Sequence, residues 1–208
     1  KIYSFMKSKG WVLGEPNKQK KRKRCRYERK YTGSLFHADY HRKDEDSPHC
    51  IFWLDDASRK ILSGGEFESP NAENAINILT VAEQKMAEYD CPILQVNTDR
   101  GSAFVSNKED GTSKFQTYCK SKGIQVIPSR VKNPQTNGKV ERRWQEYDKH
   151  RHRFSSLQSW IDWYNNRLTT ALDIEYYETP NTAFIKKLPN LFALFWKRLE
   201  NESFKNTK

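Results

Sequence analysis

Cysteine is scarce in this 208-residue sequence, and no two of its four cysteines lie close together along the chain. Cys25, Cys50, Cys91 and Cys119 are scattered and form no C-x-x-C motif. This distribution gives no sign of a zinc knuckle or of a disulfide framework. We therefore expect reduced thiols in an intracellular compartment.

Long apolar segments are missing as well. No apolar stretch reaches the roughly 18 residues that suggest a membrane-spanning helix, and no signal-peptide pattern opens the chain. We therefore expect a soluble protein that is not secreted and has no membrane partner. A start at Lys1 rather than at Met is compatible with a longer protein that continues upstream.

Acidic residues are scarce only at the N-terminus. Residues 1–30 contain 12 Lys and Arg against 2 acidic residues, whereas the remainder contains 25 against 24. Ten of the eleven net positive charges (12 − 2 = 10) therefore lie in this basic arm. Its densest part is Lys20, Lys21, Arg22, Lys23 and Arg24. Such a segment is either a solvated tail or a binding site for a polyanion, and its composition alone favours neither interpretation.

Aromatic residues are abundant, and they argue for a folded core. The chain has 6 Trp, 10 Tyr and 11 Phe although 30% of its residues are charged. The length suits one domain of roughly 150 residues with extensions. We predict a basic arm or linker at 1–30, a catalytic core at 31–154 and a helical extension at 155–208.

Strand and helix patterns alternate along the core. The apolar periodicity predicts strands at 33–41, 50–54, 60–68, 93–97 and 124–127. Helices are predicted at 72–86 with Ser69 as N-cap, around 115–119, from Glu141 to about Phe154, at 157–168, from Pro180 and at 191–199. The order predicts an α/β fold, with a mixed five-stranded sheet covered by helices on both faces and further helices at the C-terminus.

Three carboxylates are predicted to meet at one edge of this sheet. Asp39 lies on the first strand with His37 and His41 on the same face, and Asp99 follows a later strand. Glu141 lies in the first turn of a helix, where a carboxylate also complements the helix dipole. Three carboxylates on rigid elements suit Mg²⁺ or Mn²⁺, whereas ligation by a histidine would favour Mn²⁺ or Zn²⁺.

Six ordered segments resemble the integrase-core transposases of prokaryotic insertion sequences, which belong to the DDE superfamily together with retroviral integrases. The segments are Phe36-x-x-Asp39, Leu54–Arg59, Thr98–Phe104, Asn133–Arg142, Trp163–Asn165 and Thr179–Pro180. The resemblance covers about residues 27–188. It implies a ribonuclease-H-like fold and a catalytic, metal-binding triad of Asp39, Asp99 and Glu141.

The resemblance also has departures. The separation of Asp99 and Glu141 is longer than in retroviral integrases, and we assign the surplus to the polar segment 106–113, which is predicted to be a loop. A helix-turn-helix domain usually precedes the family's core, and only residues 1–13 could be its remnant. Asp55 and Asp56 lie in one matching segment, but their place in a turn favours local backbone bonding instead of catalysis.

The resemblance implies a DNA transposase, an endonuclease and polynucleotidyl transferase that uses two Mg²⁺ or Mn²⁺ ions about 3.5–4 Å apart. It would cleave transposon ends and transfer the 3′-hydroxyl into target DNA. Expected partners are double-stranded DNA, both ends and target, and at least a second copy of the chain, with no small-molecule substrate. The expected location is the cytoplasm or nucleoid of a prokaryote.

Basic residues near the triad and in the arm are the predicted DNA contacts. Those in the family segment or beside it are Arg130, Lys132, Lys139, Arg142 and Arg143, and those in the arm are Lys20, Lys21, Arg22, Lys23 and Arg24. Trp144 and Tyr147 alternate with this charge and either stack on an unpaired base or pack in the core.

Two other functions stay open from the sequence. The chain could be a truncated, non-catalytic protein that binds DNA or partner subunits and competes with an intact transposase. It could also be a plain ribonuclease-H-like nuclease, which would share the same metal chemistry.

Overall fold

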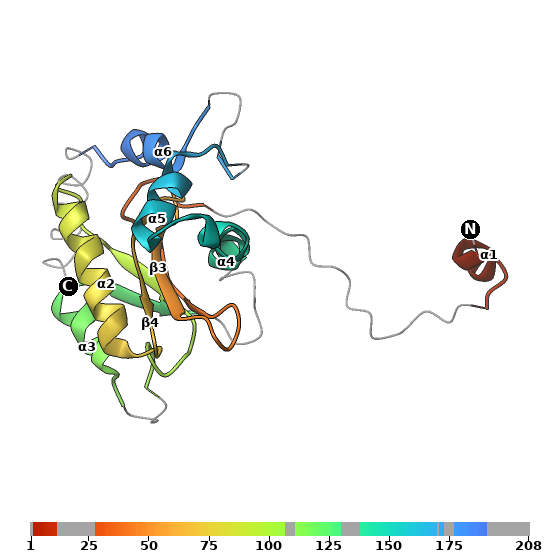
Figure 1. Cartoon of the computed structure of the whole chain (residues 1–208), viewed down its shortest axis with the longest axis horizontal. Coiled ribbons are helices and arrows are strands. Elements are labelled where there is room, and N and C mark those ends of the chain that lie inside the picture. The colour runs from red at the N-terminus through yellow and green to blue at the C-terminus, as the bar shows by residue number, and fades with distance from the viewer. Residues whose placement is uncertain are drawn as a thin grey trace, which may run out of the picture.

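A mixed sheet between two layers of helices forms the centre of the domain (Figure 1). The computed structural model describes residues 2–11, 28–106, 111–129, 138–169, 171–172 and 177–190. The strands are β1 (Phe36–His37), β2 (Tyr40–His41), β3 (His49–Asp55), β4 (Ile61–Phe67), β5 (Gln95–Thr98) and β6 (Gln125–Pro128).

The two short strands β1 and β2 are halves of one strand. Both pair antiparallel with β3, His37 opposite Leu54 and Tyr40 opposite Ile51, so the register is the same on both sides of the interruption. The sheet therefore has five strand positions, in the order β4, β3, β1 with β2, β5 and β6. The pairs β1–β5 and β5–β6 are parallel. The predicted mixed five-stranded sheet is confirmed.

Helices cover both faces of the sheet (Figure 1). The helices α2 (Ala72–Ala87) and α3 (Lys114–Ser121) share a core cluster with Ile51 and Trp53 of β3. On the other face, α4 (Gly138–His150) and α5 (Leu157–Asn166), joined through the 3-10 helix η2 (Arg151–Arg153), pack on Phe52 and Leu54. Because side chains of a strand alternate between faces, β3 contributes to both clusters.

Two shorter helices lie at the ends of the described chain. The helix α6 (Pro180–Lys186) places Phe184 in the cluster of α2 and α3, and Thr32 donates a hydrogen bond to the Phe184 carbonyl at 3.0 Å. The helix α1 (Ile2–Ser8) buries none of its residues. The helix predicted at 191–199 lies outside the described residues. Within them, no helix has the length and apolar character needed to span a bilayer.

Helix starts follow local side-chain chemistry. The prediction that Ser69 caps α2 is wrong, because the cap is Asn71, whose side chain accepts a hydrogen bond from the Asn74 N–H at 2.8 Å. Ser156 and Thr179 cap α5 and α6 through the same kind of bond. Gly123, with a φ of 70°, follows the end of α3, a position where glycine is favoured.

The outer edge of β4 is closed by one side chain of α5. Asn165 accepts a hydrogen bond from the Ile61 N–H at 3.0 Å and donates one to the Ile61 carbonyl at 2.8 Å. This pairing lies where the register between β3 and β4 shifts. The two bonds satisfy the N–H and the carbonyl of Ile61, which β3 does not pair on that side of β4.

Candidate functional site

Asp39 and Asp99 lie at the ends of neighbouring parallel strands. His37 is opposite Asn97 in the β1–β5 register, and the Ala38 N–H donates to the Asn97 carbonyl at 3.0 Å. Continued by two residues along each of these two strands, the same register places Asp39 opposite Asp99. Since neighbouring strands are about 4.8 Å apart, the two partly buried carboxylates belong to one edge of the sheet.

The carboxylate of Asp99 is oriented by the residues that follow it. The Gly101 N–H donates to Asp99 Oδ1 at 3.0 Å. A Cβ at position 101 would lie 3.1 Å from both carboxylate oxygens, closer than an ordinary contact. Arg100 turns away, and its Nε donates to the Ser129 carbonyl at 3.0 Å. The glycine therefore lets the backbone approach the carboxylate closely enough to hold it.

Glu141 lies in the first turn of α4, beside the strand that carries Asp39. Near the start of α4, Lys139 pairs with Asp56, which also bonds His37, and nine residues later Asp148 Oδ1 lies 2.8 Å from His41 Nε2. Four residues of strand and nine of helix both cover about 13–14 Å, so the helix and the strand run alongside each other here. Asp39 lies between His37 and His41, and Glu141 lies between Lys139 and Asp148, so both belong to the region where the strand and the helix run alongside each other.

Aromatic packing holds α4 on the sheet. Trp144 stacks between His41 and Phe52, with ring centroids 4.8 and 4.2 Å apart, and Tyr147 packs edge-on against Phe52 and Trp160. Trp144 and Tyr147 are both buried. Of the two interpretations open for these aromatic residues, packing in the core is the one that the structure supports.

The three carboxylates do not form a closed metal site in this conformation. Glu141 is exposed. Within the part of the chain that the structure describes, no group of three or more His, Cys, Asp or Glu side chains is arranged to hold a metal ion. The β1–β5 register brings Asp39 and Asp99 near one edge of the sheet, and Glu141 lies in the first turn of α4.

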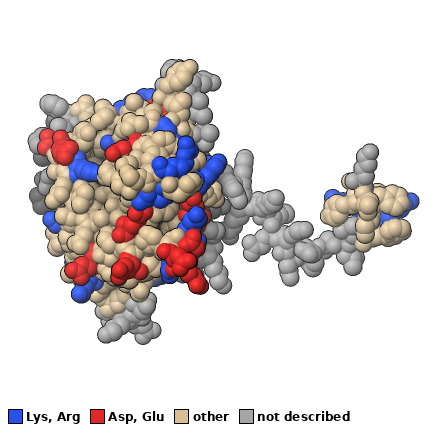
Figure 2. Space-filling view, in the orientation of Figure 1, with Lys and Arg blue, Asp and Glu red and all other residues tan. Residues whose placement is uncertain are grey.

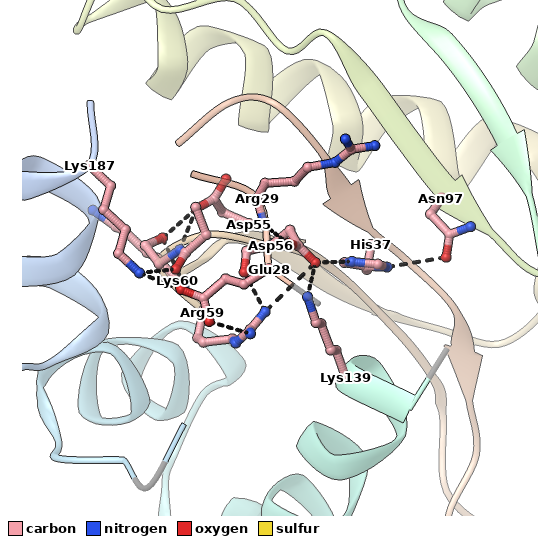
Figure 3. A network of polar contacts seen from close by, with 12 residues as sticks. Glu28, Arg29, His37, Asp55, Asp56, Arg59, Lys60, Asn97, Lys139 and Lys187 are labelled. Atoms are coloured by element: carbon pink, nitrogen blue, oxygen red, sulfur yellow. Dashed lines mark hydrogen bonds and ion pairs between the residues drawn. The ribbon is translucent and has the colours of Figure 1, made fainter. Parts of the chain in front are cut away.

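Asp56 is the centre of a buried polar network (Figure 3). Its carboxylate accepts hydrogen bonds from the Arg29 N–H and is paired with His37 Nε2, both at 2.6 Å, and with Lys139 Nζ. Burial alone would raise the pKa of Asp56, but the hydrogen bonds and charges of His37 and Lys139 hold it well below its usual value. Burial lowers the pKa of Lys139 to about 8, even though Asp56 favours its charged form.

Asp55, the neighbour of Asp56, has a different role. It accepts hydrogen bonds from the Ser58 N–H at 2.8 Å, the Ser58 hydroxyl at 2.6 Å and the Gly33 N–H at 3.0 Å, and burial raises its pKa. The predicted local backbone bonding is therefore confirmed for Asp55. It is wrong for Asp56, because its partners His37 and Lys139 come from other elements of the fold.

The two histidines beside Asp39 are occupied by protein partners. His37 is fully buried, with Nδ1 3.1 Å from Asn97 Oδ1 and Nε2 on Asp56, so neither ring nitrogen is available to a metal ion here. His41 uses Nε2 for Asp148. That the two histidines share a strand face with Asp39 stays a prediction.

Only some of the predicted DNA contacts lie in the described chain. Arg142 is exposed, one residue after Glu141. Lys139 has a side chain only 14% exposed and is paired with Asp56, while Arg143 is 4% exposed, with its guanidinium 5.6 Å from the Tyr164 ring centroid. The remaining predicted contacts, Arg130, Lys132 and the five basic residues at 20–24, lie outside the described residues. Figure 2 shows acidic and basic side chains mixed on one face of the domain.

The network around Asp56 is the feature that sequence reasoning missed. The Asp55-Asp56 pair was visible, and so was the period-two face of the first strand. No local sequence pattern predicts that the start of α4 packs beside the end of β3. This packing brings Lys139 to Asp56 across 83 residues of sequence.

Comparisons with known proteins agree with this architecture. Residues 32–134 match the integrase core domain family, rve. The chain is 27% identical over 143 residues to the protein named "Putative integrase ORF3" of Spiroplasma virus SpV1-C74, a match that covers 64% of this chain and 40% of that protein.

Solved structures with a similar fold are those of retroviral proteins. A chain of the simian T-cell lymphotropic virus intasome, solved in complex with PP2A regulatory subunit B56 gamma, has a TM-score of 0.57 at 21% identity, over 82% of this chain and 60% of that one. The BIV integrase catalytic core scores 0.53 at 15% identity, over 74% and 95%. The HTLV-2 integrase catalytic core, in complex with magnesium, scores 0.52 at 19%, over 74% and 97%. Residues 32–134 therefore match the integrase core domain family, and the chain has the ribonuclease-H-like fold of these integrase cores.

Proposed function

We propose that this chain is a metal-dependent DNA strand-transfer enzyme, the catalytic core of an insertion-sequence transposase. It would cleave the ends of the mobile element and join the freed 3′-hydroxyl to target DNA. The observation that carries this proposal is the placement of Asp39 and Asp99 at matched ends of parallel strands, with Glu141 in the adjacent first turn of α4. The match of residues 32–134 to the integrase core domain supports the same chemistry.

The donor set fits hard divalent cations. Carboxylate oxygens are the ligands that Mg²⁺ and Mn²⁺ prefer, and the Gly101 N–H already orients one of them, Asp99. Asp39, Asp99 and Glu141 would together hold such ions. When bound, two such ions supply an activated oxygen nucleophile and stabilise the leaving oxygen in a displacement at phosphorus. The magnesium complex of the HTLV-2 integrase core is a precedent for this ion.

The chain's own residues would hold DNA beside this site. Arg142 is the exposed cation next to Glu141, and a guanidinium is suited to bidentate phosphate contact. The basic arm carries ten of the eleven net charges and would add contacts to the DNA backbone that do not depend on sequence. We further propose that the enzyme acts as a dimer or larger assembly, since two element ends must be joined to one target.

The rival function is a truncated competitor that binds DNA or subunits without catalysis. The match to the viral integrase covers only 40% of that protein, which is compatible with missing parts. The presence of all three carboxylates at their expected positions favours the enzyme. Catalysis itself separates the two functions.

Replacement of Glu141 by Gln tests the proposal. Glu141→Gln removes one ligand charge while preserving the shape of the side chain, so we expect cleavage and joining of DNA ends to be lost and DNA affinity to be retained. The matched control is Glu146→Gln, the same change on α4 at a residue that pairs with Arg167 at 2.6 Å; it should retain activity. Joining by Glu141→Gln at the wild-type rate would refute the triad.

A further inference from the structure

A chain of polar contacts joins residues that lie two positions before the members of the proposed triad. Asn97 Oδ1 contacts His37 Nδ1 at 3.1 Å, His37 Nε2 contacts Asp56 at 2.6 Å, and Asp56 is paired with Lys139 Nζ (Figure 3). Asn97, His37 and Lys139 each precede a triad member by two residues, namely Asp99, Asp39 and Glu141. The polar chain therefore repeats the layout of the triad, with Asp56 as the link between the sheet and α4.

Asp56 is the part of this chain that joins separate elements. His37 and Asn97 belong to the paired strands β1 and β5, whose backbones already fix their separation. Glu141 is placed differently, because the described residues of α4 contact the sheet through side chains. Val140 packs into the aromatic cluster, and Lys139 turns to Asp56 at the end of β3. The ion pair thus fixes how the first turn of α4 is seated against the strand of Asp39.

We propose that Asp56 is a positioning residue that sets the location of Glu141 through Lys139 and of Asp39 through His37. The proposal rests on the assignment of the triad in the proposed function. It gives Lys139 a role inside the protein, in place of the DNA contact that the sequence predicts. Loss of the Asp56 charge removes the contact that ties Lys139 to the end of β3, and we expect the first turn of α4 to be held less firmly against the sheet.

Groups that orient metal ligands typically change metal affinity by 10–100-fold when they are removed. We therefore expect Asp56→Asn to raise the dissociation constant for Mn²⁺ at least tenfold. The affinity for duplex DNA should change little, since Asp56 is buried and contributes no surface charge. Backbone amides of the first turn of α4 should exchange hydrogen faster than in the wild-type protein.

The test is a titration of the full chain with Mn²⁺ alone, followed by the electron paramagnetic resonance signal of free Mn²⁺, beside hydrogen exchange of α4. Lys139→Met provides a second variant in case Asp56→Asn does not fold, and it should reproduce the loss. Lys139→Arg keeps the charge and should retain most of the affinity. The double variant Asp56→Asn with Lys139→Met should lose no more than either single variant, because both changes remove one interaction.

Glu66→Gln is the matched control. Glu66 holds the far end of the same helical unit, with the Tyr147 hydroxyl at 2.5 Å and Arg151 Nε at 2.8 Å. Its loss should destabilise the packing of α4 without moving Glu141, so its Mn²⁺ affinity should match the wild type. An effect of Glu66→Gln as large as that of Asp56→Asn would mean that general destabilisation is the cause, and would overturn the proposal.

The remaining outcomes separate this inference from the proposed function. Wild-type Mn²⁺ affinity in a folded Asp56→Asn protein overturns the positioning role and leaves the triad untouched. If Glu141→Gln also binds Mn²⁺ like the wild type, the triad fails, and the inference fails with it. Binding that depends on both Glu141 and Asp56, in a protein that joins no DNA, supports the positioning role and refutes strand transfer.

Discussion

A single backbone N–H group, that of Gly101, orients the carboxylate of Asp99. The Gly101 N–H holds one carboxylate oxygen at 3.0 Å, and the absence of a Cβ at position 101 leaves room for both oxygens. A carboxylate fixed in this way loses little further freedom when it binds a metal ion. The Asp-Arg-Gly sequence therefore orients a carboxylate that we propose as a metal ligand.

Substitution of this glycine tests the orientation of Asp99. A Cβ at residue 101 would lie 3.1 Å from both oxygens of Asp99, so Gly101→Ala must displace the carboxylate by a few tenths of an ångström. Since a misplacement of about 1 Å costs up to 10²-fold in rate, we expect strand transfer to fall on the order of tenfold. Initial rates at saturating Mn²⁺ measure the effect, and Gly123→Ala, which strains a φ of 70° although its Cβ meets open space, controls for general destabilisation. An unchanged rate would mean that Asp99 is not held by this contact.

At the scale of elements, α4 and α5 carry much of the arrangement that the site needs. The helix α4 is attached to the sheet through Trp144 and Tyr147, and α5 adds Trp160 and Tyr164 to the same cluster. The helix α5 also closes the edge of β4 through Asn165. Side chains of α4 and α5 therefore attach the second half of the domain to the sheet.

Asn165→Leu tests the contribution of the edge contact. The substitution keeps the volume of the side chain but leaves the N–H and the carbonyl of Ile61 without their partner in a buried place. Each unsatisfied group costs about 1–3 kcal/mol, so we expect the free energy of unfolding to fall by about 2–4 kcal/mol. Urea unfolding measures it. The matched control is Asn166→Leu on the exposed side of α5, and an equal small loss for both variants would contradict the account.

Much of the fold could be predicted from local patterns. The period-two alternation of His37, Asp39 and His41 placed them on one face, and Thr179-Pro180 marked a helix start. Errors arose where two local signals competed, as at Ser69 and Asn71, both good caps ahead of α2. The contact of Lys139 with Asp56 had no local signal, because it depends on how α4 is seated on the sheet.

The members of the proposed site stay a prediction from sequence motifs, and the contacts that support them could not be predicted. Asp39, Asp99 and Glu141 stand in segments with distinctive neighbours, and the parallel register placed the first two side by side. Lys139 was predicted as a DNA contact from the family resemblance and Arg143 from the local charge, although one is paired inside the protein and the other is buried over Tyr164. The sequence position of a basic residue beside a site does not show whether its side chain points to solvent or into the protein, because that depends on the rotation of the helix.

At the scale of the whole molecule, charge and catalysis are separated along the chain. The basic arm carries the net charge, whereas residues from 31 onward are nearly balanced. Glu28 and Arg29, at the base of this arm, are tied to the core through Arg59, Lys187 and Asp56. The arm thus begins next to the network that supports the triad, so DNA that it holds would be close to the site.

The most direct test of this account is a strand-transfer assay on duplex DNA ends with a free 3′-hydroxyl, in Mg²⁺ or Mn²⁺, comparing wild type with Asp99→Asn. The account predicts joined products from the wild-type chain and none from Asp99→Asn, with equal DNA binding by both proteins. No product from the wild-type chain in either metal, together with retained DNA binding, would contradict it and identify the chain as a non-catalytic DNA-binding protein.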